Sequence, residues 1–297
     1  MKNLLKEELL GRNGPLFGRS ILKCESVSGG CIHDSWKLLL ENGEELFLKT
    51  NSPEAFEILE FEFKCLASLR EFSNTEFLVV PQPIAIKKLK SFSILLMPWL
   101  NLSGIDQSLL GKGLALLHKK SAQENRDGKF GWGSNGFIGS NSQPAGWRTN
   151  WGECFFELRL LPQLLQAKCW GLEIKSFVKK KDALIAYLND HKPLPSLVHG
   201  DLWSGNAFVQ NDGKGVILDP AAWWADREVD IAMTKMFGGY SVEFYTSYEE
   251  NWPLQTSTYK RIEIYNLYHL LNHANLFGGS YKKQSIVSLE RIDQLLV

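Results

Sequence analysis

The segment 197–219 constrains the fold of this chain more than any other stretch. Apolar residues on both sides of its polar loop predict buried strand ends, and the Asn-Asp-Gly-Lys run near its end predicts a tight turn between two short strands. The loop carries Asp201 and Asn206. The hairpin that follows should return the chain so that Asp219 lies beside them.

This arrangement suits phosphoryl transfer. The reaction needs a carboxylate that orients or deprotonates the attacking hydroxyl, and two oxygen ligands that hold Mg²⁺ on the phosphates. Asp201 is the candidate base, and Asn206 and Asp219 are the candidate metal ligands. Each of these residues alone is typical of a turn or a helix cap. Their spacing, with a hairpin before the second Asp, favours the phosphotransfer interpretation.

Residues 199–206 read His-Gly-Asp-Leu-Trp-Ser-Gly-Asn, and residues 219–221 read Asp-Pro-Ala. At these positions the chain resembles the fructosamine kinase (ketosamine-3-kinase) family, a branch of the kinase-like phosphotransferases that includes aminoglycoside and choline kinases. His-Gly-Asp-x₄-Asn is common to that superfamily, whereas Leu-Trp-Ser-Gly is the sequence signature of the narrower fructosamine kinase family. One departure is His33, where the family typically has Asn.

The resemblance covers nearly the whole chain and implies a two-lobed α+β fold of the protein-kinase type. The N-terminal lobe should hold a five-stranded antiparallel sheet with one helix, and the larger C-terminal lobe should be mainly helical. We expect the nucleotide-binding lobe at 1–97, a hinge at 98–102, and the helical lobe with the polar loop and the substrate cleft at 103–297.

The first part of the chain predicts three strands and a glycine turn. Residues 21–27 and 32–40 are β runs, and a Glu-Asn-Gly-Glu hairpin leads to a third strand that ends at Lys49. In kinase-like folds this turn covers the nucleotide phosphates and this lysine reaches them. Alone, a Gly-Gly pair is usually an ordinary turn and a lysine usually a surface charge. The resemblance assigns ATP binding to Gly29, Gly30, Cys31 and Lys49.

A helix is predicted over residues 53–70, because Pro53 suits a first helical turn and apolar residues recur at intervals of three and four. Kinase-like folds pair the strand lysine with a carboxylate of this helix. Position alone leaves Glu57, Glu60 and Glu62 as candidates, and any of them could be exposed. The resemblance selects Glu62, because Glu-x-x-x-Leu-x-x-Leu matches the pattern of the family.

Two further β runs, 83–88 and 92–97, would complete the sheet and lead into the hinge. An adenine base needs one hydrogen-bond acceptor and one donor from such a segment. Pro98 has no amide hydrogen, so it can supply only the carbonyl. The amide should come from Leu100, and Met97 belongs to the same nucleotide-binding segment.

The second lobe should begin with a helix capped by Ser103 and running to Lys120. Residues 128–150 are rich in Gly, Asn, Ser and Trp and fit neither the helical nor the strand period. A loop of this length in a compact domain is usually functional or disordered, and its tryptophans argue against disorder. Further helices are predicted at 154–168 and 174–189.

Other residues are assigned around the polar loop. Trp203 offers an apolar face that suits stacking on a sugar, although it could instead be a core residue. Asp230 resembles the superfamily carboxylate that accepts hydrogen bonds from the backbone of this loop, and with His199 it should give structural support. His269 and His273 are four residues apart without a matching acidic ligand, so we expect packing or cleft-lining residues, with His273 on the substrate side.

Composition narrows the function classes. The chain has 33 basic and 33 acidic residues and no basic stripe, which argues against nucleic-acid and membrane-surface binding. No apolar stretch approaches the roughly 18 residues that span a bilayer, and the first residues lack a signal-peptide core. We therefore expect a cytoplasmic protein. The five scattered cysteines contain no C-x-x-C pair, so reduced thiols are expected.

The predicted activity is ATP- and Mg²⁺-dependent phosphorylation of a sugar hydroxyl on a ketosamine. The family implies the 3-hydroxyl, free or protein-bound substrates, and a deglycation repair role. The alternatives are a small-molecule kinase of the aminoglycoside or choline type, and a nucleotide-binding module without turnover. We expect a monomer, with a redox-linked dimer through Cys31 as an open possibility.

Overall fold

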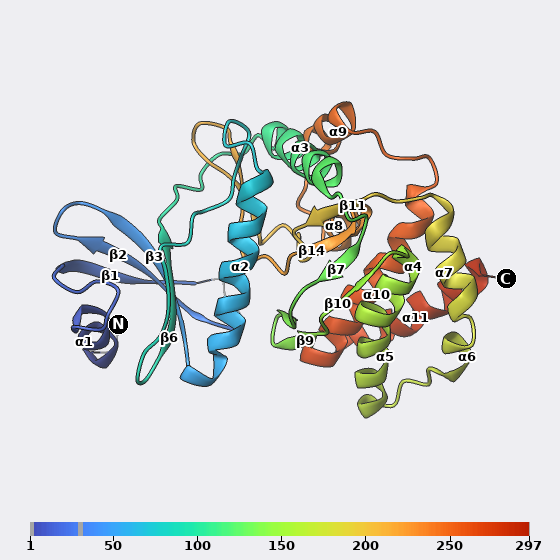
Figure 1. Cartoon of the computed structure of the whole chain (residues 1–297), viewed down its shortest axis with the longest axis horizontal. Helices are drawn as coiled ribbons and strands as arrows, with labels where there is room; N and C mark the ends of the chain where they lie inside the picture. The colour runs from blue at the N-terminus through green and yellow to red at the C-terminus, as the bar shows by residue number, and fades with distance from the viewer. Residues whose placement is uncertain (1–2, 29–31, 297) are drawn as a thin grey trace.

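The computed structural model of the chain describes residues 3–28 and 32–296. Its first part is a five-stranded antiparallel sheet in the order β1-β2-β3-β6-β5, which confirms the predicted sheet. The strands are β1 (Ile21–Val27), β2 (Asp34–Leu40), β3 (Glu45–Asn51), β5 (Ala85–Lys88) and β6 (Ser93–Pro98). Helix α2 (Phe56–Phe72) follows β3 and stands between this sheet and the rest of the molecule (Figure 1).

The inner strands of the sheet are buried on both faces, because their successive apolar side chains point to opposite sides. In β6, Ile94 and Leu96 belong to the core that includes α1 (Asn3–Leu10). Leu95 and Met97 belong instead to the larger core that includes α2. This two-residue period is that of a β-strand. Near the end of β6, Met97 thus lies on the face that meets the rest of the molecule.

The chain leaves the sheet through an irregular segment. Helix α3 (Ser108–Glu124) begins beyond Ser103, so the predicted helix start is wrong. Gly104 N donates to Val209 O at 2.9 Å, and a Cβ on Gly104 would lie 2.2 Å from Gln210 O. The segment is therefore held against the hairpin, where no helix can form around it.

The second part is mainly helical, as predicted (Figure 1). The long helix α10 (Thr258–Phe277) packs on α5, α8 and α11. A π-helical turn at Phe156–Leu160 interrupts the predicted helix 154–168. Among the described residues, no helix combines the length and the hydropathy needed to cross a membrane. The other helices are α4 (Trp151–Phe155), α5 (Leu161–Ala167), α6 (Lys175–Val178), α7 (Lys181–Asp190), α8 (Glu228–Met236), α9 (Val242–Asn251) and α11 (Ser280–Leu295).

Residues 128–150 contain four short strands, so the prediction of an irregular loop is wrong there. Each strand has three residues, which is too short for a period to appear in the sequence. The strands are β7 (Phe130–Trp132), β8 (Gly136–Ile138), β9 (Asn141–Gln143) and β10 (Gly146–Arg148). β8 pairs with β9, whereas β10 and β7 join a sheet with β14 (Trp223–Asp226) and β11 (Pro195–Val198).

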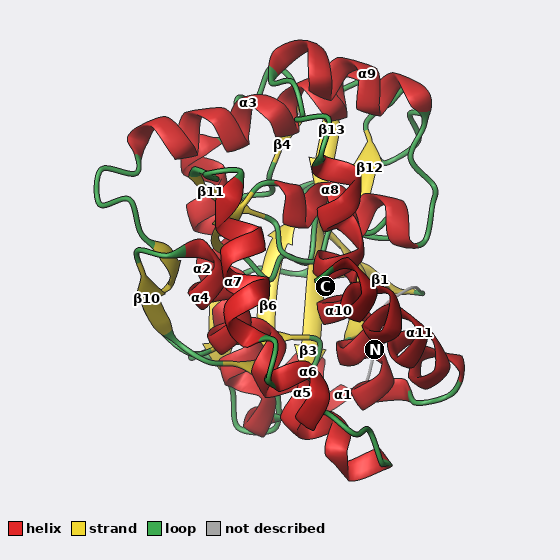
Figure 2. Ribbon diagram, turned by 90° about the vertical axis from the view of Figure 1, so that its right-hand side faces the viewer, coloured by secondary structure: helices red, strands yellow, loops and turns green. Residues whose placement is uncertain are grey.

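The predicted hairpin is present and lies where the two parts of the molecule meet. Its strands, β12 (Ala207–Val209) and β13 (Gly215–Ile217), pair in antiparallel fashion. β4 (Leu78–Val79), from the segment between α2 and β5, pairs with β13 in parallel. Figure 2 shows these three strands side by side. The hairpin is thus anchored to the segment between α2 and β5, which belongs to the first part of the molecule.

Candidate active site

The polar loop (residues 199–206) begins where the buried strand β11 ends. Gly200 has a φ of 82°, in the left-handed region, and a Cβ there would lie 2.2 Å from Ala221 O. Only glycine fits such a position without strain. The chain can therefore turn at once from the strand into the loop that carries Asp201.

Asp230, in the first turn of α8, holds the start of this loop. Its buried carboxylate accepts hydrogen bonds from His199 N at 2.7 Å and from Gly200 N at 2.9 Å. His118 Nε2 lies 3.1 Å from the same carboxylate. His199 Nε2 donates to Leu218 O at 2.7 Å, at the end of the hairpin. The two residues predicted to give support thus connect the loop to both α8 and the hairpin.

The structure brings Asp201, Asn206 and Asp219 together, and all three line one cavity. Asn206 Nδ2 donates to Asp201 O at 2.9 Å, which leaves the amide oxygen Oδ1 out of this hydrogen bond. Asp219 has a φ of 56°, a conformation that residues other than glycine seldom adopt. Backbone strain of this kind is concentrated at functional sites.

The Asp201 carboxyl lies in surroundings that disfavour its charge. Burial raises its pKa to about 7, and the negative charges of Asp219 and Asp230 add to this effect. The hydrogen bond from Asn206 works in the opposite direction. A carboxylate with a pKa near neutrality is suited to accept a proton from a hydroxyl.

Lys49 connects the sheet to the polar loop. It pairs with Leu95 between β3 and β6, so its side chain lies on the sheet face toward α2. Its Nζ donates to Glu62 Oε1 at 2.7 Å and also to Asp219 Oδ1. Burial alone would lower the pKa of Lys49, but the charges of Asp219 and Glu62 outweigh burial and raise it. Lys49 therefore stays charged.

Of the three candidate carboxylates on α2, Glu62 is the one that reaches Lys49. Glu57 is exposed, and Glu60 pairs with Lys64 at 2.9 Å on the outer side of the helix. The residue that the resemblance selected is thus the one the fold turns inward.

Two cavities meet at the centre of the molecule. The first, of about 270 Å³, lies beside the end of β6 and is lined by Met97, Pro98 and Leu100, the residues expected to contact adenine. Phe208 of the hairpin lines the same cavity. Its walls thus offer the apolar surface and the backbone groups that a flat base requires.

The second cavity, of about 200 Å³, contains the residues expected on the substrate side. It is lined by Asp201 and by both residues assigned to substrate, Trp203 and His273. Lys49, Asn206 and Asp219 line both cavities. The arrangement can therefore hold a charged group at the junction while Asp201 faces a molecule in the second cavity.

Trp203 lies at the surface of the second cavity, where 36% of it is exposed. The alternative that it is a core residue is therefore wrong. A Cβ on Gly205 would lie 2.1 Å from the Trp203 ring, so the ring rests directly on this glycine. The hydroxyl of Tyr240, from the segment between α8 and α9, donates to Leu202 O at 3.2 Å and holds the loop.

Comparison with known proteins decides the family, because the fructosamine kinase family model matches residues 13–295. The chain belongs to the fructosamine kinase family. It is 36% identical over 282 residues to a probable ketoamine kinase of Vibrio parahaemolyticus, and the match covers 93% of this chain and 94% of the relative. The chain is therefore a phosphotransferase.

Solved structures agree with this family fold. A Haemophilus somnus protein named after fructosamine-3-kinase superposes with a TM-score of 0.83 at 28% identity, covering 97% of this chain and 96% of that one. Amicoumacin kinase, solved with AMP-PNP and Ca²⁺, gives a TM-score of 0.57 at 13% identity, covering 99% of this chain and 92% of that one. The second likeness shows the fold alone.

Sequence reasoning missed several residues of this fructosamine kinase family site. Asn272 and Phe277 line the second cavity, and His118 supports Asp230. They come from α10 and α3, where the local pattern does not separate them from core residues. Phe137 of β8 also lines this cavity, as the resemblance of its segment to the family implied. Gly29, Gly30 and Cys31, which are expected to cover the phosphates, lie outside the described residues.

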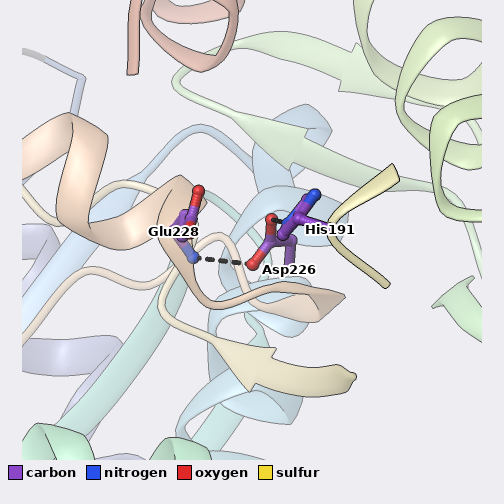
Figure 3. A group of neighbouring side chains, drawn as sticks. All are labelled: His191, Asp226 and Glu228. Atoms are coloured by element: carbon purple, nitrogen blue, oxygen red, sulfur yellow. Dashed lines mark hydrogen bonds and ion pairs between the residues drawn. The ribbon is translucent and has the colours of Figure 1, made fainter. Parts of the chain in front are cut away.

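A separate cluster of ionisable residues holds the fold of this family member together. His191, Asp226 and Glu228 lie close to one another, and His191 Nε2 is 2.7 Å from Asp226 Oδ2 (Figure 3). Asp226 also accepts a hydrogen bond from the Tyr265 hydroxyl at 2.6 Å. Arg261 donates twice to Glu228, each time at 2.7 Å. Because protein donors already serve these carboxylates, the cluster is a buried ion-pair network and not a metal site.

Proposed function

We propose that this chain transfers the γ-phosphoryl group of ATP to the 3-hydroxyl of a ketosamine, the adduct of a reducing sugar and an amine. The meeting of the two cavities at Lys49, Asn206 and Asp219 is the observation that carries the proposal. Family membership favours a ketosamine as the acceptor. The resemblance of the polar loop is the reason for choosing the 3-hydroxyl.

The first cavity is the proposed nucleotide site. We take 98–102 as the hinge between a nucleotide-binding lobe, 1–97, and a helical lobe, 103–297. Pro98 O would accept from the adenine amino group, and Leu100 N would donate to the ring. Trp99 N already donates to Glu45 O of β3. The amide of Leu100 is therefore favoured as the donor to adenine. Amicoumacin kinase, a protein of the same fold, was solved with the nucleotide analogue AMP-PNP, which supports a nucleotide as a ligand of this fold.

The junction of the cavities fits a divalent cation such as Mg²⁺. Asn206 Oδ1 and Asp219 offer two oxygen ligands of the kind that Mg²⁺ prefers. When bound, the ion would neutralise phosphate charge. Lys49 donates to Asp219 at this junction, and it would donate to the phosphates once they occupy it.

The second cavity is the proposed acceptor site. Asp201 would orient the sugar hydroxyl and accept its proton. Trp203 would cover the C–H face of the sugar, and a cationic ketosamine nitrogen near an indole gains a further cation–π attraction of about 0.5 to 2 kcal/mol. His273 lines the same cavity and would be a second contact. Phosphorylation would lead to loss of the sugar from the amine, which is a repair role for free or protein-bound adducts.

The test is an ATPase assay with a panel of acceptors. Fructose, ribulose and erythrulose adducts of one amine are compared with an aminoglycoside, choline and the free sugars. We expect consumption of ATP that depends on a ketosamine and disappears in Asp201→Asn. Equal or greater turnover of any non-ketosamine acceptor contradicts the proposal.

A further inference from the structure

Five aromatic side chains form a continuous group at the outer end of the second cavity. We call this group the aromatic rim: Trp203, Phe237, His273, Phe277 and Tyr281. Trp203 and Phe237 have ring centroids 6.4 Å apart, and Phe237 and His273 are 5.2 Å apart. His273 also contacts Phe277 at 5.8 Å and Tyr281 at 5.0 Å. The rim thus connects the polar loop with α8, α10 and α11.

The rim is part of the acceptor site and extends beyond it. Trp203, His273 and Phe277 line the second cavity. Phe237 and Tyr281 extend the same group through their contacts with His273. Phe237 is 40% exposed and Phe277 is 56% exposed. Neighbouring exposed aromatic rings beside a cavity are typical of a binding surface and are unusual on a surface without one.

The rim carries no positive charge that would repel a cationic nitrogen. His273 Nδ1–H donates to His269 O at 2.8 Å, and burial lowers the pKa of His273 below its usual range. Its ring is therefore neutral at physiological pH and behaves as a further aromatic surface.

The rim is also held in place by its neighbours. The Trp203 ring rests on Gly205, and the Tyr240 hydroxyl donates to the backbone of the polar loop. Phe237 is the C-cap residue of α8, and Phe277 is the last residue of α10. A preformed aromatic surface costs little conformational entropy when a ligand binds.

We propose that the aromatic rim binds a flat, apolar group carried on the ketosamine nitrogen, such as the benzyl group of a benzylamine adduct. This inference rests on the proposed function, because it places the sugar at Asp201 and the nitrogen at Trp203. A substituent on that nitrogen would then leave the cavity along Phe237, Phe277 and Tyr281. Flat rings stack or pack edge to face on such side chains.

A small aromatic amine suits this surface better than a lysine on a protein. A protein substrate would bring backbone amides and carbonyls to the rim. The rim offers these groups only ring faces and edges. Binding is weakened when a polar group loses its water without gaining a hydrogen-bond partner. An apolar ring has no such cost.

The test compares three adducts on the sugar that the acceptor panel identifies as best. The amines are methylamine, benzylamine and cyclohexylmethylamine, which has similar size but is not flat. We expect kcat/KM for the benzyl adduct to exceed that of the methyl adduct by about three- to tenfold, with the cyclohexylmethyl adduct between them. Equal values for the benzyl and methyl adducts overturn the inference, and so does a higher kcat/KM for a glycated protein.

Variants assign the preference to the rim. Phe237→Ala and Phe277→Leu should bring the benzyl-to-methyl ratio close to one. Tyr259→Ala removes an aromatic ring that is 66% exposed and lies outside the rim, so it should leave the ratio unchanged. Thermal melts check that each variant is folded. A ratio that stays at its original value in both rim variants overturns the inference.

Calorimetry separates this inference from the proposed function. The adducts are titrated into the wild-type protein and into Phe277→Leu. Tighter binding of the benzyl adduct that is lost in Phe277→Leu supports the rim even if no ketosamine is phosphorylated, a result that would contradict the proposed function alone. Turnover of all three adducts at equal efficiency and affinity supports the function and overturns the rim.

Discussion

At the scale of single residues, the site depends on how charge is distributed around Asp201. Its carboxyl lies near two other carboxylates, of which Asp230 is held by hydrogen bonds and Asp219 by Lys49. The proposed base therefore has the least compensated charge of the three. This difference distinguishes Asp201 as the group that can take up a proton.

The pH dependence of turnover follows from this environment. The pKa of Asp201 is raised to about 7 by burial, Asp219 and Asp230, so the ionised base is lost as the pH falls through that value. We expect kcat/KM for the ketosamine to rise with pH and to level off above about pH 7 to 8. An activity that is constant from pH 6 to 8, with circular dichroism showing a folded protein, contradicts this assignment.

A second prediction concerns the buried pair of Lys49 and Glu62. Glu62→Gln removes the carboxylate that lies 2.7 Å from Lys49 Nζ, so the lysine should no longer be held toward the phosphates. We expect KM for ATP to rise about tenfold or more. Glu57→Gln is the matched control, because Glu57 is an exposed residue of the same helix. The pairing has no role in nucleotide binding if both variants bind ATP as the wild type does.

At the scale of elements, the helices and strands that have a local sequence pattern could be predicted. The sheet, α2 and the hairpin follow from alternation, helical spacing and turn residues. The strands in 128–150 and the start of α3 do not follow from a local pattern, because they depend on contacts with residues that are distant in the sequence. Gly104, for example, is held out of a helix by its packing against the hairpin. His118 and Phe277 were missed for the same reason.

The polar loop itself gives a test of the Trp203 platform. In Gly205→Ala the new Cβ would lie 2.1 Å from the Trp203 ring, so the ring must move. We expect KM for the ketosamine to rise severalfold while KM for ATP changes little. Gly133→Ala is the control, because its Cβ would meet no atom closer than 3.8 Å. A normal KM in Gly205→Ala would show that the position of the indole does not matter to the acceptor.

The connection between α8 and α10 should matter for stability. Arg261→Ala would leave Glu228 as a buried charge without its partner. Breaking a buried pair in this way costs about 3 to 5 kcal/mol of unfolding free energy. Lys64→Ala breaks an exposed pair with Glu60 and should cost no more than about 0.5 kcal/mol. Urea unfolding measures both, and equal losses would mean that the Arg261 pair does not support the fold.

At the scale of the whole molecule, the site exists because the two parts of the chain meet. Lys49 belongs to the sheet and Asp219 to the end of the hairpin, and their side chains are paired. The pairing of β4 with β13 fixes the same junction from another side. That Asp201, Asn206 and Asp219 lie together could be predicted from their spacing, and the place of Lys49 beside them could be predicted from the resemblance. The aromatic rim could not, because its members come from separate elements.

The most direct test of the account is the identity of the phosphorylated product. A ketosamine is incubated with ATP, Mg²⁺ and either the wild-type protein or Asp201→Asn, and the product is analysed by mass spectrometry and by phosphorus and proton NMR. The account predicts one phosphate on the 3-hydroxyl of the sugar with the wild type and none with Asp201→Asn. ATP hydrolysis without a phosphorylated ketosamine, or the same product from both proteins, would contradict it.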